Sequence, residues 1–282
     1  MLTVWALSLF CIFAPILPNL HAFMLFQIKS YLKFLWYSKN EHAVHSPFVF
    51  NLITKCFYDK HSKPEYAILK TYRNSLVQNR NTIEVTDFGA GSKVFKSNNR
   101  SISKIAKTAG ISSKRAELLH RIVHYFQPQN ILEIGTSLGL ATVALSLGNK
   151  KAKITTLEGC KNTIAVAQVN LQKICCTNVE LITTEFGNFI NAANLKSKIF
   201  DLVYFDGNHQ RQATLHYFEQ LLPTITNDTV WILDDIHWSS QMEETWKIIQ
   251  QHPKVTVTID TFQWGFVFFR REQPKEHFII RV

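Results

Sequence analysis

The sequence predicts an α/β fold in which a doubly wound, mostly parallel sheet carries helices on both faces. Short apolar segments typical of buried strands alternate with longer segments typical of helices between about residues 130 and 251. A glycine-punctuated turn, Gly135 to Gly139, follows the first of these strands and opens a helix. At 282 residues the chain is long enough to bury a large core.

The expected elements follow one another with short connections. Strands are expected near residues 131–135, 153–158, 179–183, 200–206 and 229–235. Helices are expected near residues 138–148, 161–174, 210–222 and 239–251. Two further strands, 255–260 and 265–270, form an antiparallel hairpin at the end of the sheet, and residues 278–282 could add an edge strand.

The N-terminal part of the chain is helical and rich in aromatic residues. One helix is expected to end near Asn40, and Ser46-Pro47 is typical of an N-cap followed by proline at the first helical position. Two short helices should precede the first strand. The prediction is therefore a helical cap over residues 24–100, followed by an α/β domain over residues 101–282.

Residues 1–23 form an apolar extension without a single charged side chain. They lack the positive n-region of a signal peptide, and prolines interrupt the apolar run. We interpret this segment as an upstream extension, with synthesis starting at Met24; a membrane anchor is the alternative. Five cysteines without a C-x-x-C pair favour free thiols and a cytoplasmic location.

The turn after the first strand has the properties of a nucleotide-sized site. Gly135 allows a sharp turn and a close approach of backbone N–H groups to a ligand. The spacing to Gly139 lacks the close glycine pair of a dinucleotide site, and Glu133 would repel a pyrophosphate but suit a cationic ligand. Glu158 ends the next strand, where a carboxylate can accept both ribose hydroxyls.

These residues resemble the class I S-adenosylmethionine-dependent methyltransferases, whose first motif is an acidic residue before two spaced glycines. The resemblance implies a Rossmann-like, seven-stranded sheet with an antiparallel last strand, and S-adenosylmethionine as cofactor. It implies a cofactor site formed by Glu133, Gly135, Thr136, Ser137, Gly139, Glu158, Gly159, Phe186 and Asp206. Phe186 would stack on the adenine.

Carboxylates also follow the fourth and fifth strands, at Asp206 and at Asp234-Asp235. Ligands of open α/β sheets bind at this edge, and hard divalent cations take such oxygen ligands. The set resembles the catechol and caffeoyl-CoA type of O-methyltransferase, which implies Asp206, Asp234 and Asp235 as ligands of Mg²⁺ or another divalent cation. A second branch with Asp-Gly-x-His after strand four need not use metal.

His209 stands where the O-methyltransferase family has a catalytic lysine, and a histidine can act as a general base near neutral pH. We therefore expect His209 and Asp206 to be catalytic. His237 and Trp238 should lie over the mouth of the acceptor site.

The predicted function is methyl transfer to an oxygen of a small-molecule acceptor. One alternative is an RNA methyltransferase that uses a basic face over residues 93–121; others are a non-catalytic S-adenosylmethionine-binding protein and a nicotinamide oxidoreductase, which Glu133 disfavours. A homodimer is possible, and a membrane partner is expected only if residues 1–23 form an anchor.

Residues 83–92 also resemble the first motif of the methyltransferases. They are not followed by an apolar helix or by a second strand that ends in an acidic residue, as the motif requires.

Overall fold

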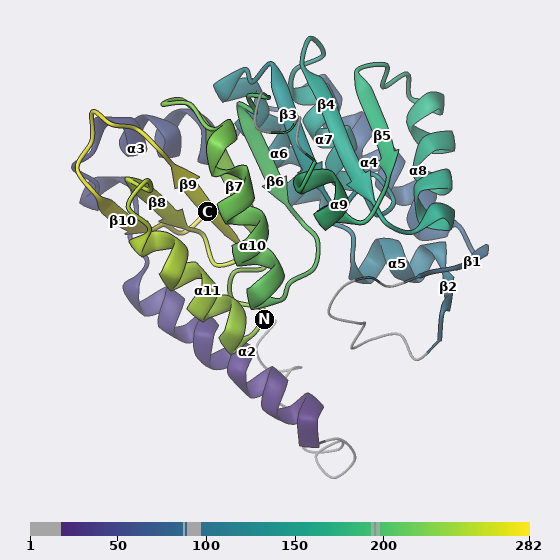
Figure 1. Ribbon diagram of the computed structural model, residues 1–282, viewed down its shortest axis with the longest axis horizontal. Coiled ribbons are helices and arrows are strands. Elements are labelled where there is room, and N and C mark those ends of the chain that lie inside the picture. Colours follow the sequence, from purple (N-terminus) through teal and green to yellow (C-terminus); the bar gives the residue numbers. More distant parts are fainter. Residues whose placement is uncertain (1–17, 87, 89–96, 193–194, 196–197) are drawn as a thin grey trace.

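The computed structural model describes residues 18–282, except residue 87 and residues 89–96, 193–194 and 196–197. Within these residues an eight-stranded sheet crosses the molecule (Figure 1) in the order β10-β8-β9-β7-β6-β3-β4-β5. Its strands are β3 (Asn130–Ile134), β4 (Lys153–Glu158), β5 (Val179–Thr183), β6 (Leu202–Phe205), β7 (Val230–Asp234), β8 (Val257–Asp260), β9 (Trp264–Phe268) and β10 (Glu276–Ile279).

The strand directions confirm the predicted fold class. Strands β5, β4, β3, β6 and β7 are parallel, and β9 runs antiparallel to both β7 and β8. All seven expected strands are present. The edge strand β10 makes an eighth, because residues 276–279 pair in parallel with β8, slightly earlier than the segment that the sequence suggested.

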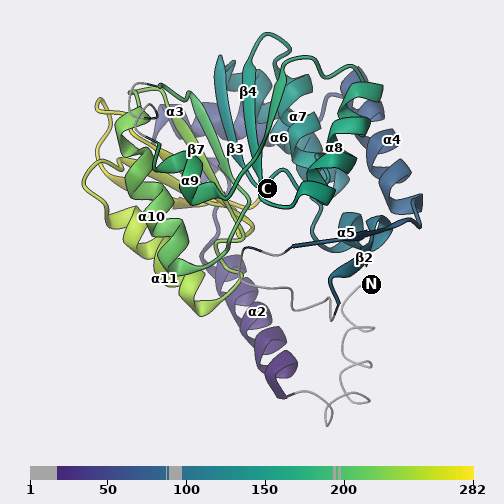
Figure 2. The same ribbon diagram turned by 45° about the vertical axis from the view of Figure 1, so that its right-hand side comes forward.

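Two hydrophobic clusters cover the two faces of the sheet, because successive strand side chains point to opposite faces. In β7, Val230 and Ile232 belong to one cluster, whereas Trp231 and Leu233 belong to the other. The helices of the α/β part (Figure 2) are α6 (Ser113–Phe126), α7 (Leu140–Gly148), α8 (Lys161–Lys173), α9 (Phe186–Ile190), α10 (Arg211–Leu221) and α11 (Ser240–Gln251). Helices α6 and α7 pack on the first cluster, and α10 and α11 pack on the second.

The N-terminal helices contribute to the same core as the sheet. They are α2 (Pro18–Tyr37), α3 (Pro47–Leu52), a π-helical turn (Ile53–Phe57), α4 (Pro64–Gln78) and α5 (Ile102–Thr108). The predicted start of α3 is confirmed, since the Ser46 hydroxyl accepts the Val49 amide at 3.4 Å. Phe48 and Phe57 then pack against Phe268 and Phe266 of β9.

A short hairpin and two 3-10 turns complete the described elements. The hairpin pairs β1 (Thr82–Glu84) with β2 (Asn99–Ser101), and the turns are Glu41–Ala43 and Leu222–Thr224. The expected domain boundary after residue 100 therefore falls inside β2.

Several sequence predictions concern residues that are described only in part. Residues 1–17 lie outside the described residues, and so does most of the glycine-rich segment 87–92, of which only Phe88 is described. Helix α2 begins before Met24, at Pro18. None of the described helices has the length and hydropathy needed to cross a membrane. The four described cysteines are all free thiols.

Candidate functional site

The turn after β3 lies against the ends of β4 and β6. Gly135 has φ = 105°, and a Cβ atom there would lie 2.2 Å from the carbonyl oxygen of Asp206, so only glycine fits. The amides of Gly135 and Thr136 both donate to the Leu157 carbonyl at 3.0 Å. The turn is thereby fixed between two strand ends.

The carboxylate of Glu158 lies beside this turn, as the sequence predicted. Its two oxygens accept the amides of Ser137 and Cys160, each at 2.9 Å. The role of this carboxylate in accepting the hydroxyls of a ribose stays a prediction. The neighbouring Gly159 is covered by Phe88, whose ring carbon would lie 2.6 Å from a Cβ atom there.

Glu133 lies beneath the turn, where the sequence analysis expected it to face a cationic ligand. It is fully buried, and one of its oxygens accepts the hydroxyls of Thr142 and Thr156 at 2.6 and 2.5 Å. Burial raises the pKa of this carboxyl to about 7. Its other oxygen is buried without a hydrogen-bond partner among the described residues. This oxygen could therefore accept a hydrogen bond from a ligand bound at the turn.

Gly139 begins α7 with φ = 79°. Its nearest neighbours belong to two other helices. A Cβ atom there would lie 3.2 Å from the hydroxyl of Tyr72 in α4 and 3.5 Å from Ala167 in α8. The Tyr72 hydroxyl donates to the Leu138 carbonyl at 2.6 Å. Sequence reasoning missed this support, because α4 lies some sixty residues before the turn.

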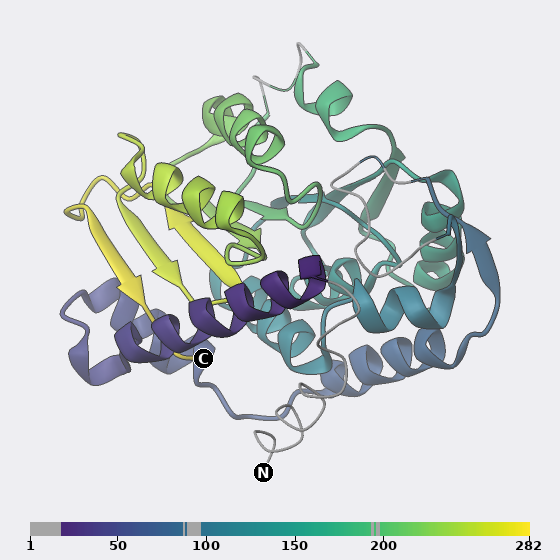
Figure 3. The ribbon, with the colours of Figure 1, turned by 90° about the horizontal axis from the view of Figure 1, so that it is seen from below.

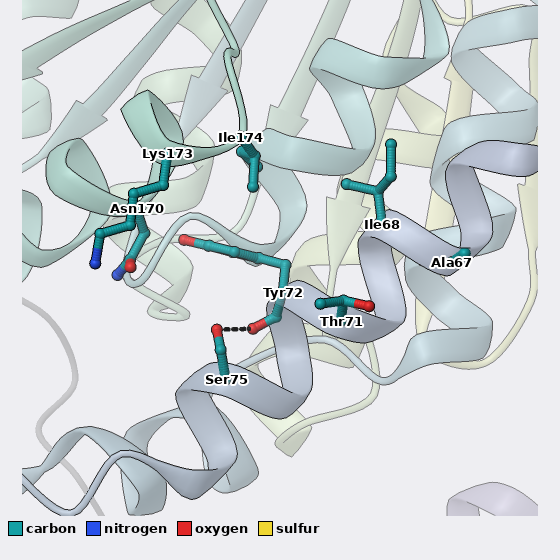
Figure 4. A pocket seen from close by; sticks show the side chains of 8 residues that line it. All are labelled: Ala67, Ile68, Thr71, Tyr72, Ser75, Asn170, Lys173 and Ile174. Carbon is teal, nitrogen blue, oxygen red and sulfur yellow. Dashed lines mark hydrogen bonds between the residues drawn. The ribbon is translucent and has the colours of Figure 1, made fainter.

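A groove of about 310 Å³ lies on the outer side of Tyr72, between α4 and α8 (Figure 4). In it the Ser75 hydroxyl donates to the Tyr72 carbonyl at 2.7 Å. The lining is mostly apolar, and none of the predicted site residues belongs to it. We conclude that this groove is not the cofactor site.

The loop after β6 places Asp206 and His209 together. The Nε2 atom of His209 lies 3.8 Å from Oδ1 of Asp206. Burial and the nearby Asp234 hold the pKa of Asp206 well above its usual range. Burial and Asp234 also raise the pKa of Asp235, to about 6, although the charge of His209 opposes this shift. The predicted carboxylates therefore do meet at one rim. Because their pKa values are raised, they carry less negative charge together than three ionised carboxylates would.

Arg115, from α6, carries the positive charge at this rim. Its guanidinium pairs with the carboxylate of Asp234 and lies over the Trp264 ring, 4.8 Å from the centroid. The Tyr204 hydroxyl donates to the other oxygen of Asp234 at 3.3 Å. The sequence analysis counted Arg115 in a surface patch, since a run of basic residues does not reveal which of them points inward.

The predicted metal ligands do not fit a divalent cation in this arrangement. No group of three or more His, Cys, Asp or Glu side chains in the described part of the chain could hold a metal ion. The reason is local: the carboxylate of Asp234 already faces the Arg115 guanidinium, and its Oδ1 also accepts the amide of Asp235 at 2.9 Å.

The loops at this rim hold unusual backbone conformations. Ser137, Asn208 and Asp235 have φ of 48°, 52° and 54°, in the left-handed region that non-glycine residues rarely adopt. Each residue stands just after a strand of the sheet, β3, β6 or β7. Such conformations concentrate at functional sites, where the surrounding structure maintains them.

Phe186 begins α9 and lies over the loop after β6. A Cβ atom at Gly207 would lie 2.4 Å from its ring, and the ring also contacts Tyr217 at a centroid distance of 6.2 Å. Its position borders the turn, and stacking on adenine stays a prediction. A small cavity nearby is lined by Phe205, Gly207, His209, Thr214, Tyr217, Leu233, Asp234 and Met242.

His237 and Trp238 lie in the loop after β7, and their side chains have structural partners. The two ring nitrogens of His237 contact Glu243 and Asp260, both at 2.8 Å. These two carboxylates raise the pKa of His237 to about 9 against the effect of burial. Gln27 of α2 donates to the carbonyls of His237 and Trp238 at 2.6 and 2.8 Å. Helix α2 therefore covers this loop.

The basic segment 93–121 does not form one continuous face. Arg115 lies at the rim, and Arg121 donates to the carbonyls of Cys56 and Phe57 at 3.0 and 3.3 Å. Lys93 and Lys96 lie outside the described residues. The other described basic residues of the segment are Arg100, Lys104, Lys107 and Lys114, and an RNA surface stays an untested alternative.

Comparison with known proteins agrees with this architecture. Residues 132–236 match the family model described as a methyltransferase domain. A search among curated proteins found no match.

Three solved structures illustrate the structural likeness. A methyltransferase of Podospora anserina with bound SAH has a TM-score of 0.55 and 15% identity, covering 80% of this chain and 97% of that chain. An O-methyltransferase of Bacillus cereus, in complex with SAH, has a TM-score of 0.51 and 17% identity, covering 75% and 92%. An O-methyltransferase of Streptomyces achromogenes involved in tomaymycin synthesis, in complex with SAM, has a TM-score of 0.52 and 13% identity, covering 74% and 91%.

The parallel sheet with one reversed strand, the glycine turn and the acidic end of β4 are the parts of a nucleotide-binding α/β enzyme. With the match of residues 132–236 to a methyltransferase domain, they identify this protein as a methyltransferase.

The support of the turn by Tyr72 can be tested with the variant Tyr72→Phe. The variant keeps the ring but loses the hydrogen bond to Leu138, which we expect to weaken the binding of S-adenosylmethionine by about two- to tenfold. Calorimetric titration measures the change. Tyr66→Phe is the matched control, because its hydroxyl contacts Arg121 instead of the turn. Equal affinities of the two variants would contradict the assigned role.

The pairing of Arg115 with Asp234 predicts a large loss of stability in Arg115→Gln. Removing the guanidinium leaves a buried carboxylate without its partner, which costs about 3 kcal/mol of unfolding free energy. Arg211→Gln is the control, since its pair with Glu244 is largely exposed and is worth less than about 1 kcal/mol. Urea unfolding of both variants makes the comparison, and similar losses would refute the prediction.

His237 predicts a fall in stability at alkaline pH. Its folded pKa of about 9 lies above the ordinary value of 6.5, so its contribution is complete below pH 6.5 and is lost as the pH rises through 9. The shift corresponds to about 3 kcal/mol. Unfolding free energies of the wild type and His237→Gln, measured across this range, should therefore converge. The exposed His42 provides the control in His42→Gln, which should follow the wild type at every pH.

Proposed function

We propose that this methyltransferase transfers the methyl group to a hydroxyl oxygen of a small-molecule acceptor, with His209 as the general base. The observation that carries the proposal is the contact between the turn after β3 and the loop after β6. Because Gly135 lies directly against the main chain of Asp206, the candidate base three residues later stands beside the turn that would hold the methyl donor. The O-methyltransferases with the same fold support oxygen as the acceptor atom.

Different residues around the turn would bind different parts of the methyl donor, S-adenosylmethionine. The turn residues Gly135, Thr136, Ser137 and Gly139 would hold the methionine end, above the buried Glu133. Glu158 would accept the ribose hydroxyls, while Gly159 and Phe186 would border the nucleoside. S-adenosylmethionine supplies an electrophilic methyl group on a sulfonium when bound.

His209 would take the proton of the acceptor hydroxyl. Its Nε2 atom accepts that proton as an oxygen lone pair forms the new bond to the methyl carbon, and the carbon–sulfur bond breaks with its electrons going to sulfur. Asp235, which interacts electrostatically with His209, stabilises the positive charge that forms on the imidazole, and Asp206 lies 3.8 Å from Nε2. The protein otherwise acts by aligning the two reactants and excluding water.

This proposal needs no divalent cation. The Arg115 guanidinium supplies the positive charge at the rim and keeps Asp234 in place. A guanidinium keeps its charge at any physiological pH, and the ion pair and the Trp264 ring hold this one in place. A small acceptor suits the site better than RNA, since two of the arginines in the basic segment point into the protein.

The proposal is tested by binding first. Calorimetric titration of chelator-treated protein should show S-adenosylmethionine binding and no NAD binding. Release of SAH is then assayed with phenols, catechols, carboxylic acids and amines as acceptors. Binding that is absent at millimolar concentration would refute the donor, and turnover that returns only with Mg²⁺ would refute the metal-free reaction.

The role of His209 predicts a split between binding and turnover. His209→Gln should bind S-adenosylmethionine like the wild type but transfer methyl groups at least about a hundredfold more slowly. His216→Gln is the matched control on α10, because its exposed ring contacts Asn191 and Tyr217 and not Asp206. Full activity of His209→Gln on an accepted hydroxyl substrate would rule out a general base at this position.

A further inference from the structure

Helix α2 has one face fixed to the protein. Its Gln27 is bonded to the loop after β7, Phe23 packs against Trp238 at 4.9 Å, and Tyr31 packs edge-on against Phe262 at 4.9 Å. Ser30 and Phe34 are buried on the same side. The helix is therefore a fixed part of the fold, although it projects from the body of the molecule (Figure 1). Figure 3 shows it from below, where it lies in front of the other elements.

The other face of α2 is apolar and exposed. Leu25, Ile28, Leu32 and Trp36 follow a spacing of three or four residues, which places them in one stripe along the helix. Their exposed fractions rise along the helix from 46% at Leu25 to 84% at Trp36. Seven of the fourteen large exposed hydrophobic residues in the described chain lie on this helix, whereas the others are scattered. A concentration of this kind marks an interaction surface.

The charges around this stripe are positive. Lys29 and Lys33 are exposed on α2 and flank the stripe, and Lys39 follows the helix. No acidic residue occurs in the sequence before Glu41, and the whole chain has a net charge of +10. An apolar helical stripe bordered by lysines is typical of helices that lie in the headgroup region of an anionic membrane.

We propose that α2 docks this protein on the surface of an anionic lipid bilayer. The apolar stripe would enter the boundary between headgroups and acyl chains, and the lysines would contact phosphate groups. In the sequence, residues 1–17 directly precede the helix and carry no charged side chain.

The inference is tested with the full-length protein and two kinds of vesicle. Sedimentation with vesicles of phosphatidylcholine and phosphatidylglycerol should carry the protein down, and vesicles of phosphatidylcholine alone should carry much less. Binding to the anionic vesicles should weaken as salt is raised. Equal binding to both vesicles, or none to either, would overturn the proposal.

A double variant, Leu32→Ser with Trp36→Ser, locates the surface. Its binding to anionic vesicles should fall by roughly tenfold or more, because two large exposed side chains lose their apolar area. The matched control combines Val169→Ser with Ile248→Ser, two exposed apolar residues on other helices, and should bind like the wild type. S-adenosylmethionine affinity should be the same in all three proteins, which separates this inference from the proposed reaction.

Two outcomes of the variant experiment would overturn the assignment. Unchanged vesicle binding by the double variant would show that another part of the chain meets the lipid. A dimer in sedimentation velocity that the same two substitutions dissolve, together with no vesicle binding, would show that a second copy covers the stripe.

Discussion

The close approach of two strand-end loops organises this molecule. The turn after β3 and the loop after β6 belong to neighbouring parallel strands, and they can touch only because Gly135 has no side chain and adopts a conformation that other residues rarely take. Asp206 directly follows β6, and its amide donates to the Ile134 carbonyl at 2.9 Å, which connects the same two strand ends. The donor side and the acceptor side of the site therefore share one backbone constraint.

Electrostatics at the rim follow from the burial of three carboxylates. Asp206, Asp234 and Asp235 cannot all be ionised together in a largely buried place without a compensating charge. This protein meets that need with the guanidinium of Arg115 and with raised pKa values at Asp206 and Asp235. An arginine is held in a fixed geometry by a carboxylate and an aromatic ring, and it keeps its charge at any physiological pH.

The sequence predicted the fold and much of the cofactor side, because both depend on local patterns. Alternating apolar residues report burial in a strand, and Gly135 and Glu158 stand at fixed distances from strand ends. The missed features depend on contacts between distant segments: Tyr72 reaches the turn from α4, and Arg115 reaches Asp234 from α6. Composition could not show that Glu133 is enclosed by two threonines, or that His237 is held between two carboxylates.

Helix α2 shows why a segment that is apolar on all sides is hard to interpret from sequence. The sequence analysis interpreted residues 1–23 as an upstream extension or an anchor, but α2 begins at Pro18 and has an inner face that the fold uses and an outer face that it leaves exposed. The inner face is hydrogen-bonded to the loop after β7. The first residue of this loop, Asp235, carries one of the carboxylates at the rim. Any partner on the outer face of α2 is consequently connected through one helix to the acceptor side of the site.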